Sequence, residues 1–171
     1  MNFRRKDFHC GKNLLKSTES TILELESVLS NIPWKPIFSF QQEDKTYLHQ
    51  AAYNHAIASE ILNLENWESQ PSLRKSPRLI GDFRKNLVFV EVQFGNSSTL
   101  YRDYYKFQFG LANGLLSIAV LIVPEAPQAF FPKRNSPHSV SNMAEFSLAD
   151  TCLSILPINV PTILYGLKNS N

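Results

Sequence analysis

The sequence predicts an α/β fold in which a central mixed β-sheet is flanked by helices. Apolar residues recur at helical spacing in three segments, residues 19–31, 46–64 and 99–113. Two further segments, residues 87–94 and 115–123, are short runs rich in Val, Ile, Leu and Phe, as in buried strands. Because the helix at 99–113 lies between these two strands, we expect the strands to be parallel and joined by a right-handed crossover.

The first third of the chain is predicted to be mainly helical. A capping-box pattern from Thr21 to Glu24 is followed by apolar residues at helical spacing until Pro33, which predicts a helix over residues 19–31. The apolar and alanine positions of residues 46–64 predict a second, closely packed helix. Glu60 lies on this helix, where an exposed glutamate is a commoner explanation than a further acid of a functional site.

The segment around Arg84-Lys85-Asn86, which reads as a turn, predicts a β-hairpin with strands at about residues 79–83 and 87–94. Since side chains alternate along a strand, Glu91 and Gln93 share one face, about 6.6 Å apart. The opposite face carries the apolar side chains Val88, Val90, Val92 and Phe94.

The last third predicts a strand, a loop, a helix and a strand. Gly114 ends the third helix, and the apolar run after it is the best candidate for a central strand. Residues 124–137 hold four prolines and are predicted to form a loop, followed by a helix over residues 140–154. Residues 158–167 supply the final strand, in which Pro161 indicates either an edge position or the start of the strand.

Length and composition indicate one globular domain spanning residues 1–171. A chain of 171 residues, 43% hydrophobic and 19% charged, needs no disulfide framework to fold. No signal peptide or membrane span is apparent, so we expect a soluble, cytoplasmic protein with Cys10 and Cys152 reduced. The net charge of +2 does not argue for nucleic-acid binding by itself, because phosphate contact depends on local basic clusters.

Glu91 is the first candidate for a functional residue. An acid inside an apolar strand is costly to bury without a partner. If the hairpin folds back, Asp82 lies next to Glu91, and two carboxylates with the amide oxygen of Gln93 suit magnesium better than zinc. The alternative is that Glu91 pairs with a base such as Arg84 or Lys106 and that Gln93 faces solvent.

These residues carry a resemblance. Asp82 followed nine positions later by Glu91-x-Gln93 is similar to the active-site signature of the BglII and BstYI branch of type II restriction endonucleases, in the PD-(D/E)XK nuclease superfamily. Most of the superfamily has lysine where this branch and this chain have glutamine. Residues 91–96 resemble the branch's Glu-Val-Gln-Phe-Ser-Asn segment, and residues 131–136 resemble a later Phe-Pro-x-x-Asn-Ser loop.

The resemblance implies a restriction-endonuclease-like core. It also implies a Mg²⁺-dependent hydrolase that cuts double-stranded DNA at a short palindromic site, and the family likeness suggests a site with a GATC core. Asp82, Glu91 and Gln93 would be catalytic, and the two acids would hold the metal. Gln93 would orient the attacking water or approach the metal through its carbonyl oxygen. A palindrome implies a homodimer, and a restriction-modification system implies a cognate DNA methyltransferase as partner.

The resemblance also suggests DNA contacts. Base contacts are expected from Asn96, Asn135 and Ser136, because amides and hydroxyls can bond to base edges in the major groove. Phosphate contacts are expected from four basic residues, Arg102, Lys106, Lys133 and Arg134.

Several alternatives remain open. Asn and Ser are also common turn formers, and each basic cluster taken alone reads as solvated surface. His49, His55 and His138 are potential bases, although no spacing singles one out. Two other functions remain open, a nuclease of DNA processing or repair with little sequence preference and an inert DNA-binding module on the same scaffold.

Overall fold

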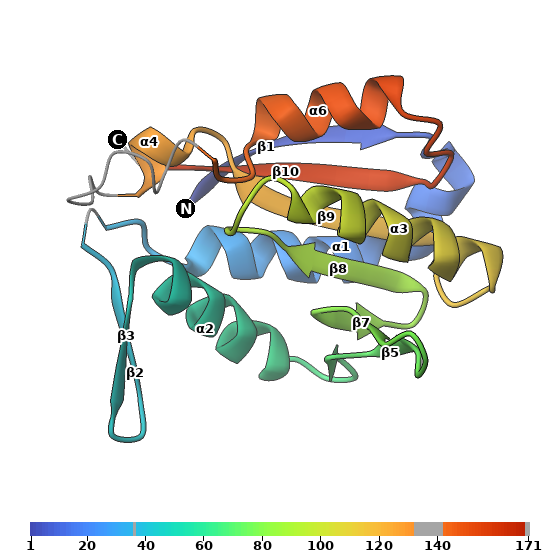
Figure 1. The fold of residues 1–171 in the computed structure, drawn as a ribbon. Coiled ribbons are helices and arrows are strands. Elements are labelled where there is room, and N and C mark those ends of the chain that lie inside the picture. The colour runs from blue at the N-terminus through green and yellow to red at the C-terminus, as the bar shows by residue number, and fades with distance from the viewer. Residues whose placement is uncertain (36, 132–141, 170–171) are drawn as a thin grey trace.

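A computed structural model describes residues 1–35, 37–131 and 142–169. Its centre is a six-stranded sheet in the order β1-β10-β9-β8-β7-β4 (Figure 1). β10 and β8 run parallel to β9, and the other neighbours are antiparallel. The sheet is therefore mixed, as the sequence predicts. In sheet order the strands are β1 (Asn2–Phe8), β10 (Thr162–Lys168), β9 (Ile118–Pro124), β8 (Val88–Val92), β7 (Phe83–Lys85) and β4 (Glu68–Ser69).

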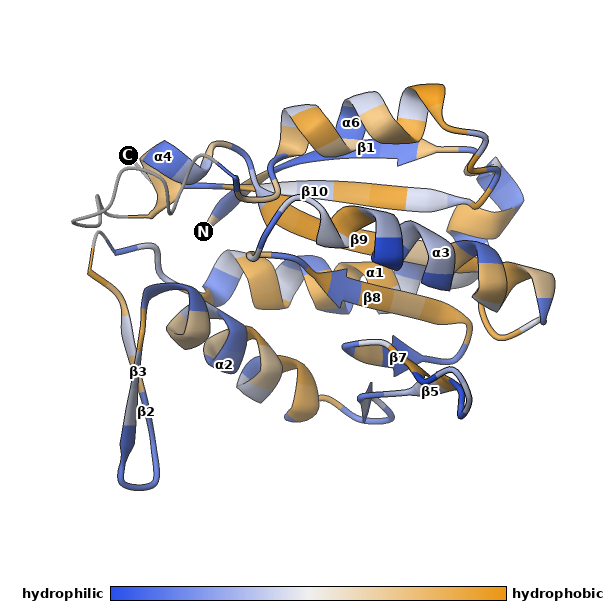
Figure 2. Ribbon diagram, viewed as in Figure 1, coloured by the Kyte–Doolittle hydropathy of each residue, from blue (hydrophilic) through white to orange (hydrophobic). Residues whose placement is uncertain are grey.

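Helices cover both faces of the sheet. On one face α1 (Lys12–Asn31) and α2 (His49–Leu62) share an apolar core with inward side chains of β8, β9 and β10. On the other face α3 (Thr99–Ala112) and α6 (Phe146–Ile155) share a second core with the alternate side chains of the same strands. Figure 2 shows the central strands largely in orange, since both of their faces are buried.

The region that joins β8 to β9 follows the sequence prediction closely. β9 is buried along its whole length, and β8 pairs with it in parallel, from Val88 opposite Ile118 to Val92 opposite Ile122. α3 connects the two strands and ends before Gly114, whose φ of +66° is a conformation that glycine adopts readily.

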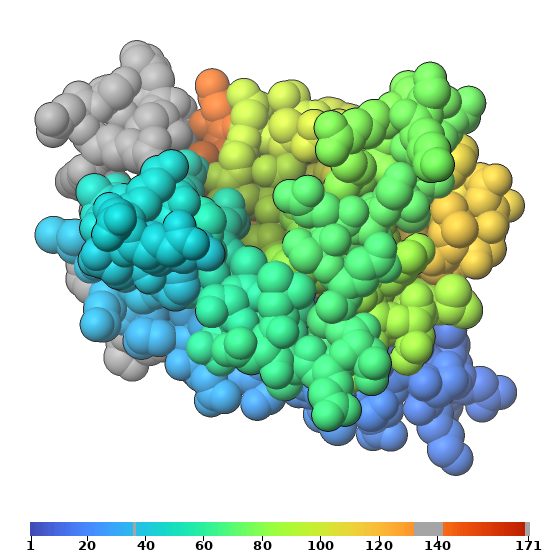
Figure 3. Space-filling model, turned by 90° about the horizontal axis from the view of Figure 1, so that it is seen from below, coloured from blue at the N-terminus to red at the C-terminus, as the bar shows by residue number. Residues whose placement is uncertain are grey.

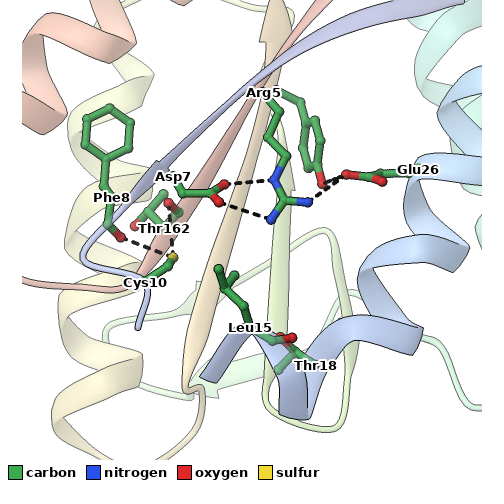
Figure 4. A network of polar contacts seen from close by, with 9 residues as sticks. Arg5, Asp7, Phe8, Cys10, Leu15, Thr18, Glu26 and Thr162 are labelled. Carbon is green, nitrogen blue, oxygen red and sulfur yellow. Dashed lines mark hydrogen bonds and ion pairs between the residues drawn. The ribbon is translucent and has the colours of Figure 1, made fainter. Parts of the chain in front are cut away.

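The N-terminal segment departs from the sequence prediction. Residues 2–8 form the edge strand β1, and α1 begins at Lys12 instead of residue 19. Figure 4 shows how β1 is tied to α1: Arg5 bonds to Glu26 of α1 at 2.9 Å and, within β1, to Asp7 at 2.8 Å. The hydroxyl of Tyr165 on β10 also donates to Glu26. The charged side chains interrupt the apolar pattern by which a strand is recognised in sequence. They are tolerated in β1 because an edge strand can carry polar residues on its open side.

Two hairpins also differ from the prediction. Residues 46–48 are not the start of a helix but belong to β3 (Lys45–Leu48), which pairs with β2 (Ser39–Gln42) in a hairpin that projects from the molecule (Figure 1). The predicted β7–β8 hairpin forms, but its turn is at Asn86 and Leu87, with Asn86 at a φ of +53°. β6 (Leu79–Ile80) pairs instead with β5 (Ser72–Arg74).

The final strand is not at an edge. β10 lies between β1 and β9, and Pro161 precedes its first residue. Proline is tolerated there because the missing N–H falls outside the ladder, while its carbonyl accepts from Ala119 at 2.8 Å. The helix predicted at residues 140–154 is α6, which begins at Phe146. The described part of the predicted loop at residues 124–137 contains the short α4 (Pro127–Phe130).

Two predictions about the chain as a whole can be compared with the structure. In the described part of the chain no helix is both long and apolar enough to cross a bilayer. Cys10 and Cys152 are free thiols. Burial raises the pKa of Cys10 to about 11, so this thiol is protonated at neutral pH.

Candidate active site

The carboxyl group of Asp82 lies where the pairing of β7 with β8 ends. Phe83 of β7 is opposite Val90 of β8, and the chain leaves the ladder just before Phe83. The side chain of Asp82 then takes the place of a backbone carbonyl, because its Oδ2 accepts the N–H of Val92 at 2.7 Å. Asp82 is therefore held beside the strand that carries Glu91.

Glu91 is buried in β8, on the sheet face that α3 covers. The residue is 3% exposed and shares this face with Phe89, whereas Val88 and Val90 point toward α1 and α2. The backbone of Gly81 approaches closely. A Cβ atom there would stand 2.2 Å from the ring of Phe89 and 3.2 Å from Oε1 of Glu91, so this position has no room for a side chain.

Lys106 of α3 neutralises one oxygen of Glu91. Its ammonium donates to Oε2 of Glu91 at 2.8 Å and to Oδ1 of Asp103 at 2.9 Å, and all three side chains are at most 5% exposed. Oε1 of Glu91 is buried without a hydrogen-bond partner in the described chain. A buried acceptor left without a partner costs about 1–3 kcal/mol, which indicates that a ligand or water belongs there.

The amide of Gln93 is engaged at both ends. Its Nε2 donates to Oδ2 of Asp103 at 3.0 Å, and its Oε1 accepts the N–H of Gly95 at 2.9 Å. Gln93 thus neither faces solvent at a sheet edge nor directs its oxygen toward Asp82 and Glu91. This differs from the role that the resemblance implies, and the reason is Asp103, an acceptor on α3 that the sequence pattern did not single out.

Burial and mutual repulsion raise the pKa of Glu91 and of Asp82. Burial raises the pKa of Glu91 to about 9, and the negative charges of Asp82 and Asp103 add to this effect. Burial also raises the pKa of Asp82, although the bond from Val92 opposes it. Burial alone would lower the pKa of Lys106, but the adjacent carboxylates outweigh it and raise that pKa. Three acids around one buried ammonium form a site that favours a further cation.

Two cavities meet at Asp82. One of about 240 Å³, which we call the α2 cavity, is lined by Asn54, His55, Ala58, Ser69, Gln70, Asp82, Phe83 and Val92. The other, about 320 Å³ and called the arginine cavity, is lined by Gln70, Arg78, Leu79, Ile80, Gly81, Asp82, Arg102 and Lys106. Figure 3 shows the surface hollowed between the atoms of α2 and those of the segment before β7. Asp82 lines both cavities and is partly exposed.

A family model described as restriction endonuclease BglII/BglIII matches residues 3–167 of this sequence. The chain belongs to the BglII/BglIII family of restriction endonucleases. Members of this family are type II site-specific endonucleases, and this assignment favours the restriction enzyme over the two other functions that the sequence left open.

Solved structures of BglII share the fold. The structure of BglII complexed with a DNA 16-mer is 19% identical, with 99% of this chain and 79% of that chain covered and a TM-score of 0.77. Free BglII is 20% identical, with 99% and 81% covered and a TM-score of 0.67. The restriction-endonuclease-like core that the sequence predicts is thus confirmed. A comparison with curated proteins found no match.

Within this BglII/BglIII fold, the residues expected to contact DNA lie in different surroundings. Asn96 is exposed in the loop before α3, where its Oδ1 accepts the N–H of Ser98 at 2.9 Å, and Arg102 is exposed on α3. Lys106 is 4% exposed and paired with acids, so we do not assign it to a phosphate. The other four expected contacts lie outside the described residues, namely Lys133, Arg134, Asn135 and Ser136.

The acid on α2 and the histidines that the sequence offers as bases lie in different surroundings. Glu60 is exposed on α2. The ring of His55 stacks on Tyr47 with centroids 3.6 Å apart, although it also lines the α2 cavity. Nδ1 of His49 is buried without a partner in the described chain. His138 lies outside the described residues.

The donor set of the BglII/BglIII-like site fits a hard divalent cation of the magnesium type. The buried oxygen of Glu91 that lacks a partner and the nearby carboxylate of Asp82 are hard oxygen ligands. No group of three or more His, Cys, Asp or Glu residues in the described chain is arranged to hold a metal. Mg²⁺ matches a pair of acids, because it usually keeps several waters and takes one or two carboxylates together with substrate phosphate.

Proposed function

We propose that this protein is a homodimeric, Mg²⁺-dependent type II restriction endonuclease that cuts double-stranded DNA at a short palindromic site, with a GATC core as the first candidate. The observation that supports this most is the buried oxygen of Glu91 that has no hydrogen-bond partner in the described chain, close to the charge of Asp82, which lines an open cavity. Family membership supplies the reaction class.

In this proposal Asp82 and Glu91 hold the magnesium ion at the wall of the arginine cavity. The ion supplies Lewis-acid stabilisation of the charge that develops on the scissile phosphate and promotes ionisation of the attacking water. Asp82 is held for this task by the N–H of Val92, and Glu91 by Lys106.

Arg78 and Arg102 line the same cavity as Asp82 and are both exposed. We propose that they bind the phosphates next to the scissile bond, where positive charge increases affinity without reading sequence. Two basic residues of β7 are already paired: Arg84 with Glu68 at 2.7 Å and Lys85 with Glu24 at 2.7 Å.

Sequence recognition is proposed for Asn96, together with Asn135 and Ser136, which lie outside the described residues. Asn96 lies in the segment between β8 and α3, and an exposed amide can bond to adenine in the major groove. The proposed homodimer explains how both strands of a palindrome are cut, since one site reaches one strand. A cognate methyltransferase would protect the host DNA.

The test is to incubate the purified protein with unmethylated phage DNA and Mg²⁺ and to sequence the fragment ends. The proposal predicts discrete fragments whose ends share one palindrome, and no cleavage in the presence of a chelator. Ends without a common sequence would support a nuclease of low specificity instead. Absence of Mg²⁺-dependent cleavage would contradict the proposal altogether.

A further inference from the structure

A continuous chain of hydrogen bonds links the acidic strand β8 to α3. It runs from the N–H of Gly95 to Gln93, on to Asp103, then to Lys106 and back to Glu91. Every bond in this chain is between 2.8 and 3.0 Å. Two side chains of α3, three residues apart, therefore contact both functional side chains of the strand.

We propose that Asp103 and Lys106 are positioning residues that fix the orientation of Glu91 and Gln93 for the reaction. This inference rests on the proposed nuclease function, because it gives the two residues a task in the same site. Neither residue is proposed to touch the substrate or the metal.

Lys106 determines which oxygen of Glu91 is available. Its ammonium holds Oε2, and the remaining oxygen, Oε1, stands beside the backbone of Gly81 with no hydrogen-bond partner in the described chain. The ammonium is itself held by Asp103, which is 0% exposed. A carboxylate clamped at one oxygen presents the other in a fixed direction, which is what a ligand to a cation requires.

Asp103 determines the orientation of the Gln93 amide. A carboxylate can only accept, so it selects Nε2 of Gln93 and turns Oε1 toward the N–H of Gly95. Gln93 then contributes by fastening the end of β8 to α3, and not by offering its oxygen to the metal. A lysine at position 93 would bring a second ammonium to Asp103, beside that of Lys106.

The location of the network distinguishes it from an ordinary buried ion pair. Lys106 lines the arginine cavity together with Asp82, so the pair stands at the wall of the proposed site. A purely structural pair in that place would be replaceable by apolar side chains of similar volume with little loss of stability. A positioning pair would not be replaceable without loss of function.

The test compares Lys106→Met, Lys106→Arg and Asp103→Asn with the unsubstituted protein. Mn²⁺ binding to the full chain without DNA is followed by electron paramagnetic resonance. The cleavage rate is measured with the metal present, and DNA affinity is measured separately in the presence of a chelator. We expect Lys106→Met to weaken both Mn²⁺ binding and the cleavage rate about 10- to 100-fold, the usual cost of losing an outer-sphere partner. DNA affinity should be unchanged, and Lys106→Arg should recover much of the loss.

The sign of the Mn²⁺ effect is decisive. If Lys106 acted only as a nearby positive charge, its removal would tighten Mn²⁺ binding, because like charges repel. Tighter or unchanged Mn²⁺ binding in Lys106→Met would therefore overturn the proposal. If Lys106→Met does not fold, the Asp103→Asn variant tests the proposal instead. Asparagine has nearly the size of aspartate and keeps an oxygen that accepts from Lys106, but it presents an N–H donor to the Gln93 amide. If Asp103→Asn binds Mn²⁺ and cleaves DNA like the unsubstituted protein, the positioning proposal is also overturned.

Two controls separate this inference from the proposed function. Lys85→Met removes a partly buried lysine–glutamate pair between β7 and α1, with side-chain exposures of 13% and 34%, and should leave Mn²⁺ binding and cleavage unchanged. Glu91→Gln should abolish Mn²⁺ binding and cleavage. If Glu91→Gln still binds and cuts, the proposed function fails. If it is inactive while Lys106→Met and Asp103→Asn behave like the unsubstituted protein, only the positioning role fails.

Discussion

The ammonium of Lys106 lies 2.8 Å from Oε2 of Glu91, and the two residues are only 4% and 3% exposed. This pair explains how an acid is tolerated inside an apolar strand. It satisfies one oxygen and leaves the other, beside Gly81, without a hydrogen-bond partner in the described chain. The acid is thus partly neutralised by the protein and partly available to a cation.

Asp82→Asn should remove activity without unfolding the protein. An amide oxygen can still accept the N–H of Val92, so the local bond is kept, but the negative charge is lost. Because burial raises the pKa of Asp82, its charge costs stability, and the melting temperature of the variant should equal or exceed that of the unsubstituted protein. Cleavage should fall at least about 100-fold. Asp150→Asn, which alters an ion pair with Lys6 elsewhere, is the matched control.

Stabilisation by a divalent cation should increase with pH. The pKa of Glu91 is raised to about 9 in the folded protein, whereas an unfolded chain has an ordinary carboxyl pKa. The folded state therefore holds this proton more tightly, and its stability falls as pH rises from the ordinary carboxyl range to about 9. Since a cation binds the ionised acid, the rise in melting temperature caused by Ca²⁺ should be larger at higher pH.

Melting curves with and without Ca²⁺ at several pH values measure this effect. Glu91→Gln provides the reference, because it has no proton to lose at this position. A Ca²⁺ effect that is independent of pH, or equally large in Glu91→Gln, would be inconsistent with Glu91 as the cation ligand.

Gly81→Ala should disturb the site through packing. The added Cβ would stand 2.2 Å from the ring of Phe89 and crowd Oε1 of Glu91 at 3.2 Å. Overpacking of this kind costs about 1–3 kcal/mol in unfolding free energy, which denaturant titration can measure. Gly11→Ala is a suitable control, since no atom lies within 4 Å of its Cβ position. Equal stability of the two variants would show that the close approach at Gly81 is not essential.

Arg102→Ala and Arg78→Ala should each weaken DNA binding regardless of sequence. Both arginines line the cavity at Asp82 and are exposed. A lost phosphate contact reduces the slope of log affinity against log salt by about one. Arg84→Ala should leave the slope unchanged, because Arg84 is paired with Glu68. If the slope of log affinity against log salt is unchanged in Arg102→Ala and Arg78→Ala, these two arginines do not contact DNA phosphates.

The central part of the fold could be predicted from sequence because its elements are uniform. β9 is apolar along its length, α3 has regular helical spacing, and the alternation in β8 places Glu91 opposite the apolar face. β1 was not predicted because its charged residues conceal an edge strand. The β2–β3 hairpin was missed because the apolar spacing of α2 continues into residues 46–48.

The site itself could be predicted only in part. Asp82 lies beside the strand that carries Glu91, as the sequence predicts, because the hairpin joins them locally, and their catalytic role is part of the proposal. Asp103 and Lys106 act across the layer between helix and sheet, which no periodicity in β8 reveals. The available signal was an acid and a lysine three residues apart on the helix that follows the Glu-x-Gln strand. The sequence offers Lys106 both as a phosphate contact and as an alternative partner of Glu91, and the structure shows the pair with Glu91.

The most direct test of the central claim is cleavage by Glu91→Gln. The variant is mixed with DNA carrying the recognition site and Mg²⁺, and single-turnover cleavage is compared with that of the unsubstituted protein. The account predicts that specific binding persists while the rate falls at least about 100-fold. Cleavage at the unsubstituted rate would contradict the assignment of Glu91 as a metal ligand, and with it the proposed active site.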